Sequence, residues 1–398
     1  MSVKVMAVNA GSSSLKFKLY QMPEEFVIAH GIADRIGHED GIFQITFQGK
    51  KQRKILPLPD HRLAVKLLLE ALVDLKVVAD LQEIGAIGHR IVQGGKYFSD
   101  SVVFSEDAAK KIASLIPLAP LHNKAHLIGY EAFKEALPKT PTIAVFDTAF
   151  HQTMAPEDYL FPIPYEYFEK YDIRRYGAHG TSHQYLGLEA SKLLPGVKHP
   201  RVISCHIGSG ASITAIKDEK CVATSMGLTP LGGIMMGTRT GDLDPSVMMH
   251  ACKMTGKDVF EMYRIFNHQS GLLGVSGISN DTRDLETATE KGSERAKITN
   301  ALFARRTADF IGQYFIRLGG ADLIVFSAGI GENSPFYREL ILEEIKDGLG
   351  IVYDRELNRR IRGEQAIISL PESKIKVAII PTDEELMIAR DCMRILNL

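Results

Sequence analysis

The segment Val3–Tyr20, VKVMAVNAGSSSLKFKLY, contains the pattern on which the fold prediction rests. Its first six residues are an almost unbroken apolar run, and the small, turn-forming stretch NAGSSS follows. The stretch LKFKLY then alternates apolar and polar residues with a period of two, which is typical of a half-buried strand. We therefore predict that the chain opens with a β-hairpin whose turn is made of small residues.

A similar segment, CHIGSGASIT at Cys205–Thr214, lies about half the chain length further on. Both segments run from apolar residues through Gly and Ser into a second stretch with strand character. A duplicated domain, in which each copy opens with a strand, a tight turn and a strand, would produce this repeat. A chance match between two decapeptides explains it equally well.

Strand-like and helix-like segments alternate along the rest of the chain, which favours an α/β architecture. The clearest helix is Ser293–Leu318, with Ser293 as N-cap and Gly319 just past its end. Thr382, followed by Glu385, predicts a capping box that begins a last helix and places Glu384 in its first turn. Further helices are expected over Leu63–Leu75 and Ala125–Phe133, and buried strands over Val202–Ile207 and Leu323–Phe326.

A chain of 398 residues exceeds what one core organises, so we expect two domains. Hydrophobic and charged fractions of 45% and 24% are those of a globular protein, and a net charge of −1 argues against a nucleic-acid binder. No apolar run approaches the ~20 residues of a membrane helix, and the N-terminus lacks a signal-peptide pattern. We expect a cytoplasmic protein without membrane contact, with reduced thiols at Cys205, Cys221, Cys252 and Cys392.

Four segments of small residues each follow an apparent strand. Their backbone N–H groups can approach phosphate oxygens closely, because few Cβ atoms stand in the way. Lys16 and Arg239 lie within or beside two of them, which indicates a polyphosphate ligand. Neither the P-loop nor the Rossmann glycine pattern is present, which argues against Walker-type NTPases and Rossmann dehydrogenases. The segments are Gly11–Ser14, Gly208–Gly210, Gly237–Gly241 and Gly329–Gly331.

Three ionisable residues stand at unusual positions. Arg90 closes the apolar strand IGAIGHRIV, Asp147 ends the strand TIAVFD, and His179 lies among small residues in YGAHGTSH. Strand ends are where α/β proteins collect functional residues. Each also has a structural explanation: an ion pair for Arg90, a turn cap for Asp147 and a satisfied interior position for His179. His183 follows His179 by four residues, but without a third ligand pattern we expect no zinc site there. Glu384 could equally be a surface acid that complements a helix dipole.

These motifs resemble those of the acetate kinases from one end of the chain to the other. The matching strings occur in the family order: VNAGSSSLKF, GHRIVQGG, PLAPLHN, FDTAFHQTM, RRYGAHGTSH, HIGSGAS, TPLGGIMMGTRTGDLDP, FSAGIGENS and IPTDEELMIAR. The resemblance implies the α/β fold of the actin, sugar-kinase and heat-shock-chaperone superfamily: duplicated actin-like (ribonuclease H-like) domains with mixed sheets, flanking helices and an interdomain cleft. Residues 1–150, completed by a C-terminal helix at 382–398, would form the first domain, and residues 151–381 the nucleotide-binding one.

The resemblance also implies the reaction, which is reversible transfer of the γ-phosphoryl group of ATP to acetate, giving acetyl phosphate and ADP. The implied cofactor is Mg²⁺, with Mn²⁺ as a substitute, and the implied assembly is a homodimer. Arg90 is similar to the arginine that binds the substrate carboxylate, and Asp147 to an essential acid. His179 and Arg239 resemble the pair that stabilises the transition state. The other implied roles are the walls of the acyl pocket (Val92, Leu121, Ala178 and Pro230), Mg²⁺ ligands (Asn9 and Glu384) and nucleotide contacts (Ser12, Ser14, Lys16, His206, Ile207, Gly208, Ser209, Gly210, Asp281, Thr282, Arg283, Gly329, Ile330, Gly331, Glu332 and Asn333).

Several positions depart from the family strings. Ala178 replaces a phenylalanine, which would enlarge the acyl pocket unless a neighbour fills the space, and Ser209 replaces an asparagine near the ATP phosphates. Gln93, Gly232 and Asp383 also differ from the usual residues. Three alternatives therefore stay open: a kinase for propionate or butyrate, a pyrophosphate-dependent enzyme, and a nucleotide-gated binding protein like the actin and chaperone branches.

Overall fold

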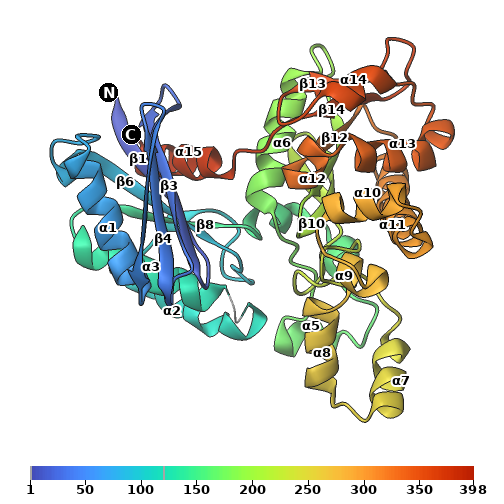
Figure 1. The fold of residues 1–398 in the computed structure, drawn as a ribbon, viewed down its shortest axis with the longest axis horizontal. Helices are drawn as coiled ribbons and strands as arrows, with labels where there is room; N and C mark the ends of the chain where they lie inside the picture. The colour runs from blue at the N-terminus through green and yellow to red at the C-terminus, as the bar shows by residue number, and fades with distance from the viewer. Residues whose placement is uncertain (1, 120–121) are drawn as a thin grey trace. The chain divides into compact units, whose positions relative to one another are not determined.

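The computed structural model describes residues 2–119 and 122–398 and divides the chain into two compact units (Figure 1). Unit 1 consists of Met1–Phe150 and Asp383–Leu398, and unit 2 of His151–Thr382. Each unit contains one mixed sheet flanked by helices. The expected α/β class with two mixed sheets is therefore confirmed.

The predicted hairpin lies at the centre of the sheet of unit 1. β1 (Val3–Ala10) pairs antiparallel with β2 (Ser14–Met22), and Gly11 N–H donates to Ser14 O at 2.7 Å to close the turn. On its other side β1 pairs in parallel with β6 (Ile84–Ile91), and β6 pairs in parallel with β8 (Thr142–Phe146). The sheet order is β5-β4-β3-β2-β1-β6-β8-β7, with β3 (Phe26–Asp34), β4 (His38–Phe47), β5 (Lys50–Leu58) and β7 (Val102–Val103).

Helices cover both faces of this sheet. Helices α1 (His61–Asp74) and α3 (Asn123–Ala136) share a core with Ile87 of β6, while the adjacent Gly88 faces α15 (Glu384–Leu396). Because successive strand residues point to opposite faces, α15 covers the face that α1 and α3 leave open. A Cβ atom on Gly88 would lie 2.3 Å from Ile388 Cγ2, so only glycine allows this packing. Helix α2 (Glu106–Ser114) packs beside α3.

The last helix starts one residue later than the capping box predicted. Asp383, not Thr382, is the N-cap of α15, and its carboxylate accepts from Leu386 N–H at 3.1 Å. The carboxylate also accepts from Lys18 Nζ and from the Tyr20 hydroxyl, each at 2.9 Å. An aspartate with these two partners is a better cap than the neighbouring threonine. The Thr382 hydroxyl instead contacts Ser182, and Thr382 belongs to unit 2.

The sheet of unit 2 repeats the central arrangement of unit 1. β9 (Arg201–Ile207) pairs antiparallel with β10 (Ala211–Lys217) and in parallel with β12 (Leu323–Ser327). The same pairing relates β1 to β2 and β6, so the two similar segments of the sequence occupy equivalent positions. The order is β11-β10-β9-β12-β14-β13, with β11 (Lys220–Thr224), β13 (Ala366–Ile367) and β14 (Lys376–Ile379).

The long helix α11 (Glu294–Leu318) has the predicted caps. The Ser293 hydroxyl accepts from Ala296 N–H, and Gly319 ends the helix with a left-handed φ of 67°. Strands, α11 and α13 (Pro335–Leu349) enclose the main core of unit 2. The other helices of this unit are α4 (Pro156–Tyr159), α5 (Glu166–Tyr171), α6 (Gly180–Lys192), α7 (Pro245–Thr255), α8 (Val259–His268), α9 (Gly271–Ser276), α10 (Thr282–Glu290), α12 (Ala328–Asn333) and α14 (Arg355–Arg360).

Two of the four small-residue segments differ from the prediction. Gly237–Gly241 follows no strand, because the stretch from Ser225 to Met236 is irregular in the described structure. In this irregular stretch the apolar residues Ile234–Met236 are buried without forming a strand. Gly233 and Gly241 have left-handed φ values of 97° and 74°, which a strand does not accommodate. Gly329–Gly331 does follow a strand but lies inside α12.

All four cysteines are free thiols, and Cys205, Cys221 and Cys392 are buried, as expected. Among the described helices, none is both long enough and apolar enough to cross a membrane.

His89 provides a test of how burial sets stability. It is 2% exposed on β6, lies edge-on to Phe104, Tyr130 and Phe133, and its Nε2 atom has no hydrogen-bond partner within the described residues. Burial lowers the pKa of His89 to about 3.

We predict that His89→Leu removes part of the acid sensitivity of unfolding. The pKa of His89 is lower in the folded protein than in the unfolded chain, where it is ~6.5. This difference contributes to the free energy of unfolding in full above pH ~6.5, and the contribution is lost as the pH falls toward 3. Between pH 7.5 and pH 5 the free energy of unfolding of the wild type should therefore fall by about 2 kcal/mol more than that of the variant. Urea denaturation at both pH values measures this difference. Parallel pH profiles for the two proteins would contradict it.

Candidate active site

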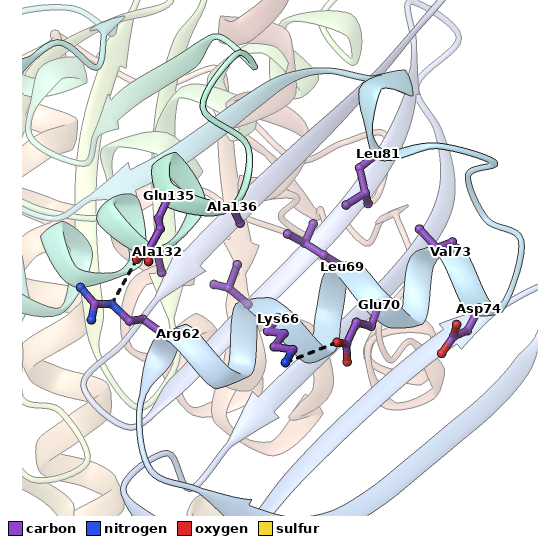
Figure 2. Close-up of a pocket in the computed structure, with 11 residues that line it drawn as sticks. Arg62, Lys66, Leu69, Glu70, Val73, Asp74, Leu81, Ala132, Glu135 and Ala136 are labelled. Carbon is purple, nitrogen blue, oxygen red and sulfur yellow. Dashed lines mark ion pairs between the residues drawn. The ribbon is translucent and has the colours of Figure 1, made fainter.

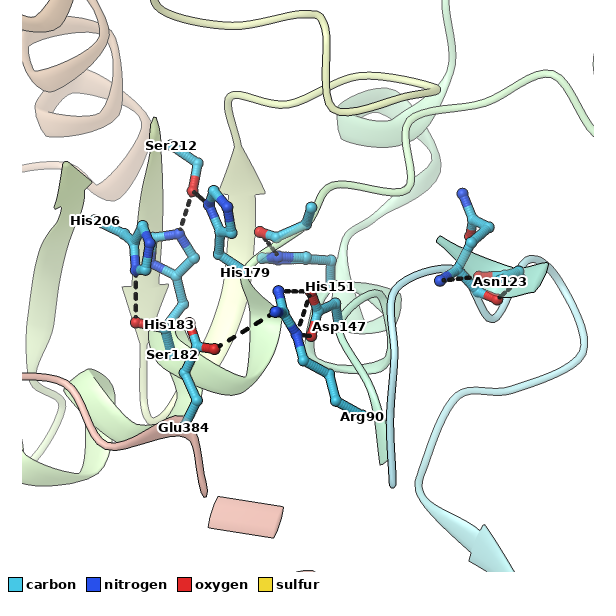
Figure 3. Close-up of polar contacts among 12 residues, drawn as sticks. Arg90, Asn123, Asp147, His151, His179, Ser182, His183, His206, Ser212 and Glu384 are labelled. Atoms are coloured by element: carbon cyan, nitrogen blue, oxygen red, sulfur yellow. Dashed lines mark hydrogen bonds and ion pairs between the residues drawn. The ribbon is translucent and has the colours of Figure 1, made fainter. Parts of the chain in front are cut away.

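Arg90, Asp147 and Glu384 form one cluster in unit 1 (Figure 3). Arg90 is the last but one residue of β6, Asp147 directly follows β8, and Glu384 begins α15. Because β6 and β8 are parallel, with Arg90 opposite Val145, their carboxyl ends meet at one edge of the sheet. The pairing of distant strands therefore assembles the cluster.

Arg90 binds the carboxylate of Asp147 through two donors. Nε lies 2.9 Å from Oδ1 and Nη2 lies 2.6 Å from Oδ2, a bidentate geometry that is strong and specific. Asp147 is only 1% exposed. The Arg90 Nη1 atom also lies 3.8 Å from Oε2 of Glu384. The ion pair expected for Arg90 is thus present, with a second carboxylate beside it.

Carboxylates outnumber guanidinium groups in this cluster. Burial raises the pKa of Glu384, and Asp147 and Glu385 raise it further, while Arg90 acts in the opposite direction. Burial acts to lower the pKa of Arg90, but Asp147 and Glu384 raise it above its ordinary value. Arg90 faces two carboxylates, Asp147 and Glu384, so the three charged groups together carry one excess negative charge, while Glu385 is paired with Lys18. A buried site with this charge favours an additional cation.

The end of the first hairpin lies within electrostatic reach of this cluster. Asn9 and Lys16 are opposite each other in the register of β1 and β2. Helix α15, which begins with Glu384, packs against β1 and β2, and the ammonium charge of Lys16 acts against the rise in the pKa of Glu384. Ser12 is exposed in the turn, and Ser14 begins β2. The structure therefore brings the predicted hairpin residues and Glu384 into the same region of unit 1.

His179, Arg239 and Gly210 meet in unit 2. His179 is the N-cap residue of α6 and has a left-handed φ of 58°. A Cβ atom built on Gly210 would lie 3.3 Å from Nη1 of Arg239 and 3.5 Å from Nε2 of His179. Glycine at position 210 therefore leaves two nitrogen donors bordering the same small space.

Arg239 is a half-buried cation without a carboxylate partner. Its Nη1 atom donates to Pro230 O at 3.3 Å, and within the described chain no acid forms an ion pair with it. Burial lowers the pKa of Arg239, because desolvation disfavours the charged form. A guanidinium in this position favours an anionic ligand, since the ligand would supply the missing counter-charge.

His183 cannot act with His179 as a metal-ligand pair in this arrangement. Its Nδ1 atom lies 2.8 Å from Ser204 Oγ and its Nε2 atom lies 2.7 Å from Ser212 Oγ, so both ring nitrogens contact hydroxyl groups. His179 Nδ1 lies 2.9 Å from the same Ser212 Oγ. The histidines of this region are therefore joined through serines (Figure 3).

A cavity of about 460 Å³ in unit 2 unites three predicted nucleotide segments. One wall is the turn between β9 and β10, another is the start of α10, and a third is α12. At its rim Arg283 lowers the pKa of Asp281 to about 2. The predicted residues that line the cavity are Gly208, Ser209, Asp281, Thr282, Arg283, Gly329, Ile330 and Asn333.

The other predicted nucleotide residues lie outside this cavity. His206, Ile207 and Gly331 are buried, and Gly210 borders His179 as described. The Glu332 carboxylate accepts from the N–H groups of Ala328 and Thr382, so it fixes the start of α12. Lys16, Ser12 and Ser14 belong to unit 1.

The predicted acyl-pocket residues come from both units. Val92 is buried in unit 1, Ala178 is buried in the core of unit 2, and Pro230 is half-buried there. The carbonyl of Ala178 accepts from Nε2 of His151 at 3.0 Å. Leu121 lies outside the described residues.

A separate groove of about 590 Å³ lies between α1 and α3 in unit 1 (Figure 2). Val65, Leu69 and Val73 of α1 line it, and exposed ion pairs such as Arg62 with Glu135 stand at its edge. It contains none of the predicted site residues. It therefore plays no part in the site described above.

Sequence reasoning missed a residue that fixes α12, one wall of the cavity. Arg338 on α13 is 1% exposed and donates to the carbonyls of Gly331, Glu332 and Ile361 and to Asn358. Burial lowers the pKa of Arg338 to about 10. No local pattern identifies this role, because its partners lie on α12 and α14. Asn280 and Ser334, which also line the cavity, directly precede and follow predicted residues.

Comparisons with known proteins agree over the full length. The model of the acetokinase family matches residues 4–390. Acetate kinases of Anoxybacillus flavithermus and Bacillus subtilis are each 50% identical, over 99% and 98% of this chain and 99% of theirs. The crystal structure of Porphyromonas gingivalis acetate kinase has a TM-score of 0.93 and 42% identity, covering 99% of this chain and all of that one. A propionate kinase from Francisella tularensis also has a TM-score of 0.93, with 40% identity, covering 98% and 99%.

We predict that Arg338→Met destabilises unit 2. The substitution leaves several buried carbonyls without a donor, at a cost of about 3 kcal/mol, and should lower the midpoint of thermal unfolding by about 6–12 °C. The matched control is Arg305→Met, because Arg305 forms an exposed pair with Glu344 at 3.3 Å. That pair is worth at most about 1 kcal/mol. Equal midpoints for the two variants, measured by circular dichroism, would contradict this account.

Proposed function

The chain belongs to the acetokinase family, whose enzymes are phosphotransferases with a carboxyl group as acceptor, and we propose that it transfers the γ-phosphoryl group of ATP reversibly to acetate. The products are acetyl phosphate and ADP. The observation that carries this proposal is Arg239, a half-buried guanidinium without a carboxylate partner among the described residues, beside His179. Such a position is suited to an anion whose charge grows during the reaction.

The chemistry requires positive charge because both reactants are anions. Two unit charges ~4 Å apart repel by about 4 kcal/mol at an effective dielectric of ~20. In a loose phosphoryl-transfer transition state, negative charge spreads over the equatorial oxygens. Arg239 and His179 donate hydrogen bonds to these oxygens in our proposal. A carboxylate acceptor is already ionised at neutral pH, so the reaction needs no general base.

Arg90 binds the carboxylate of the acid in this proposal. Its Nε and Nη2 atoms are occupied by Asp147, and its Nη1 atom lies on the side of Glu384. Asp147 therefore orients the guanidinium and holds it charged. Val92, Ala178, Pro230 and Leu121 are proposed as the walls around the methyl group.

Mg²⁺ fits the chemistry of the Glu384 region. A carboxylate and the amide of Asn9 are the oxygen donors that Mg²⁺ prefers, and the cluster carries an excess of negative charge. The described residues contain no group of three or more His, Cys, Asp or Glu side chains placed for a metal. The ion would neutralise phosphate charge.

The cavity between the β9–β10 turn, α10 and α12 is proposed as the nucleotide site. Its lining combines small residues with backbone N–H groups at the start of α10 and polar side chains such as Asn280 and Asn333. These groups suit the ribose and phosphates of a nucleotide. Ser209, with its shorter side chain, keeps a pyrophosphate donor open as an alternative.

A homodimer is the assembly that we propose. The α7–α8 pair exposes a group of large apolar side chains, of which Phe260 is 82% and Met249 is 71% exposed. Met254 and Tyr263 belong to the same group. Apolar patches of this kind mark protein interfaces, and a second copy of the chain is the proposed partner. The cytoplasmic location stays a prediction.

We predict that incubation with ATP, Mg²⁺ and a short acid yields an acyl phosphate that hydroxylamine traps as the hydroxamate. Propionate should give a kcat/KM within about tenfold of that for acetate, because each CH₂ changes binding by at most ~0.8 kcal/mol. This second candidate rests on the small Ala178 side chain and the similarity to a propionate kinase. An acetate preference above tenfold would contradict the broad pocket. Turnover with pyrophosphate but not ATP would identify the other donor, and no signal with any acid would favour a nucleotide-gated binding protein.

We predict that Arg239→Ala lowers kcat by about 10³-fold or more, because the transition state loses a charge-stabilising donor. Arg90→Lys should instead raise KM for the acid by about 10–100-fold, since the hydrogen-bonding fork is lost while the charge beside Asp147 remains. Lysine avoids leaving Asp147 buried without a cation. Arg305→Ala is the control and should leave both constants unchanged. The same loss of ATP affinity in the Arg239 and Arg90 variants would contradict the assignments.

A further inference from the structure

An unbroken chain of hydrogen bonds leads from Ser204 in the core of unit 2 to His179, and Figure 3 shows its part from His183 through Ser212 to His179. Ser204 Oγ on β9 lies 2.8 Å from Nδ1 of His183 on α6. Nε2 of His183 lies 2.7 Å from Ser212 Oγ on β10, which lies 2.9 Å from Nδ1 of His179. Ser204, His183 and Ser212 are all 0% exposed. We call these three residues the relay.

The relay has two self-consistent directions. In the first, Ser204 donates to His183 Nδ1, His183 Nε2–H donates to Ser212, and Ser212 donates to His179 Nδ1. In the second, every donor and acceptor is exchanged, and His179 Nδ1–H donates to Ser212. His183 is neutral in both, because burial lowers its pKa well below the ordinary value and His151 and His206 lower it further. A neutral imidazole carries one N–H, so the direction at one end determines the direction at the other.

Ser204 selects between the two directions. Its hydroxyl contacts no acceptor other than His183 Nδ1 within the described residues. In the second direction the Ser204 proton would be buried without an acceptor, which is unfavourable. In the first direction every hydroxyl proton has an acceptor. The chain therefore favours a His179 whose Nδ1 accepts and whose proton is on Nε2.

The Nε2 atom of His179 lies on the side where a hydrogen-bond donor could contact a phosphoryl oxygen. It borders the space at Gly210 that Nη1 of Arg239 also borders. The ring of His206 stacks on His179 with centroids 4.2 Å apart, so His206 and Arg239 are among the titratable or charged groups that face this imidazole in addition to the relay.

We propose that Ser204, His183 and Ser212 are positioning residues that hold His179 in the Nε2–H tautomer, so that it donates to a phosphoryl oxygen while neutral. This inference rests on the proposed function for its catalytic consequence, but the tautomer itself is a property of the protein without ligands. The relay explains how His179 can be a donor without first taking up a proton. Without it, the neutral ring could also adopt the Nδ1–H tautomer, whose Nε2 atom cannot donate.

Two measurements test the relay. Long-range ¹H–¹⁵N correlation spectra of the nucleotide-free protein, labelled at histidine, distinguish the two tautomers, and His179→Asn identifies the resonance. The wild type should show the Nε2–H form of His179. Ser204→Ala and Ser212→Ala should each shift His179 toward the Nδ1–H form or a mixture.

The second measurement is steady-state kinetics of the same two variants. Their kcat at pH 8 should fall about tenfold with KM for ATP and acid nearly unchanged, because the lost interaction concerns the transition state.

The matched control is Thr214→Val, which removes a buried hydroxyl paired with Thr224 on the same sheet, 2.8 Å away and outside the relay. It should leave the tautomer and kcat unchanged. A wild-type His179 with its proton on Nδ1 would overturn the proposal, as would a kcat loss in the serine variants without a tautomer change. The wild-type spectrum decides even where a variant fails to fold. Absence of acyl phosphate formation by the wild type would refute the proposed function while leaving the tautomer measurement valid.

Discussion

Each sheet is organised around one strand that pairs antiparallel with the next strand in sequence and in parallel with a distant one. β1 has this role in unit 1 and β9 in unit 2. Parallel pairing places carboxyl ends side by side, and these ends supply part of the candidate site. Arg90, Asp147 and the Gly208 turn all occupy such positions. Chemistry at strand ends is thus a consequence of the pairing.

The two units differ in their local charge. In unit 1 Arg90 contacts the carboxylates of Asp147 and Glu384. A cation can bind to these carboxylates, and the carboxylate of a substrate can compete with Glu384 for one guanidinium nitrogen. In unit 2 Arg239 is a half-buried cation that no described acid neutralises. Acid-rich and acid-poor surroundings suit the two needs of phosphoryl transfer, which are metal binding and stabilisation of phosphate charge. The family assignment and the electrostatics therefore lead to the same chemistry.

The sequence predicts local features well because their causes are local. The hairpin follows from its alternation, and the ends of α11 follow from Ser293 and Gly319. The errors have non-local causes. Asp383 displaces Thr382 as cap because Lys18 and Tyr20 approach it from β2, and no spacing in the last segment contains that information. Arg338 and Ser204 escape prediction for the same reason, since their partners come from elements far away in sequence. The positions of Arg90 and Asp147 could be predicted, but the two-donor bond between them could not.

The cap of α15 has a mechanical consequence. The chain passes from unit 2 to unit 1 between Thr382 and Asp383, and each residue is tied to its own side: Thr382 to Glu332 and Ser182, Asp383 to Lys18 and Tyr20. Between these two anchors only the torsions that flank one peptide bond remain unfixed by the contacts named. This link between the units is therefore a single peptide bond whose flanking residues are each held within their own unit, and α15 is attached to β2 of unit 1 from its N-cap onward.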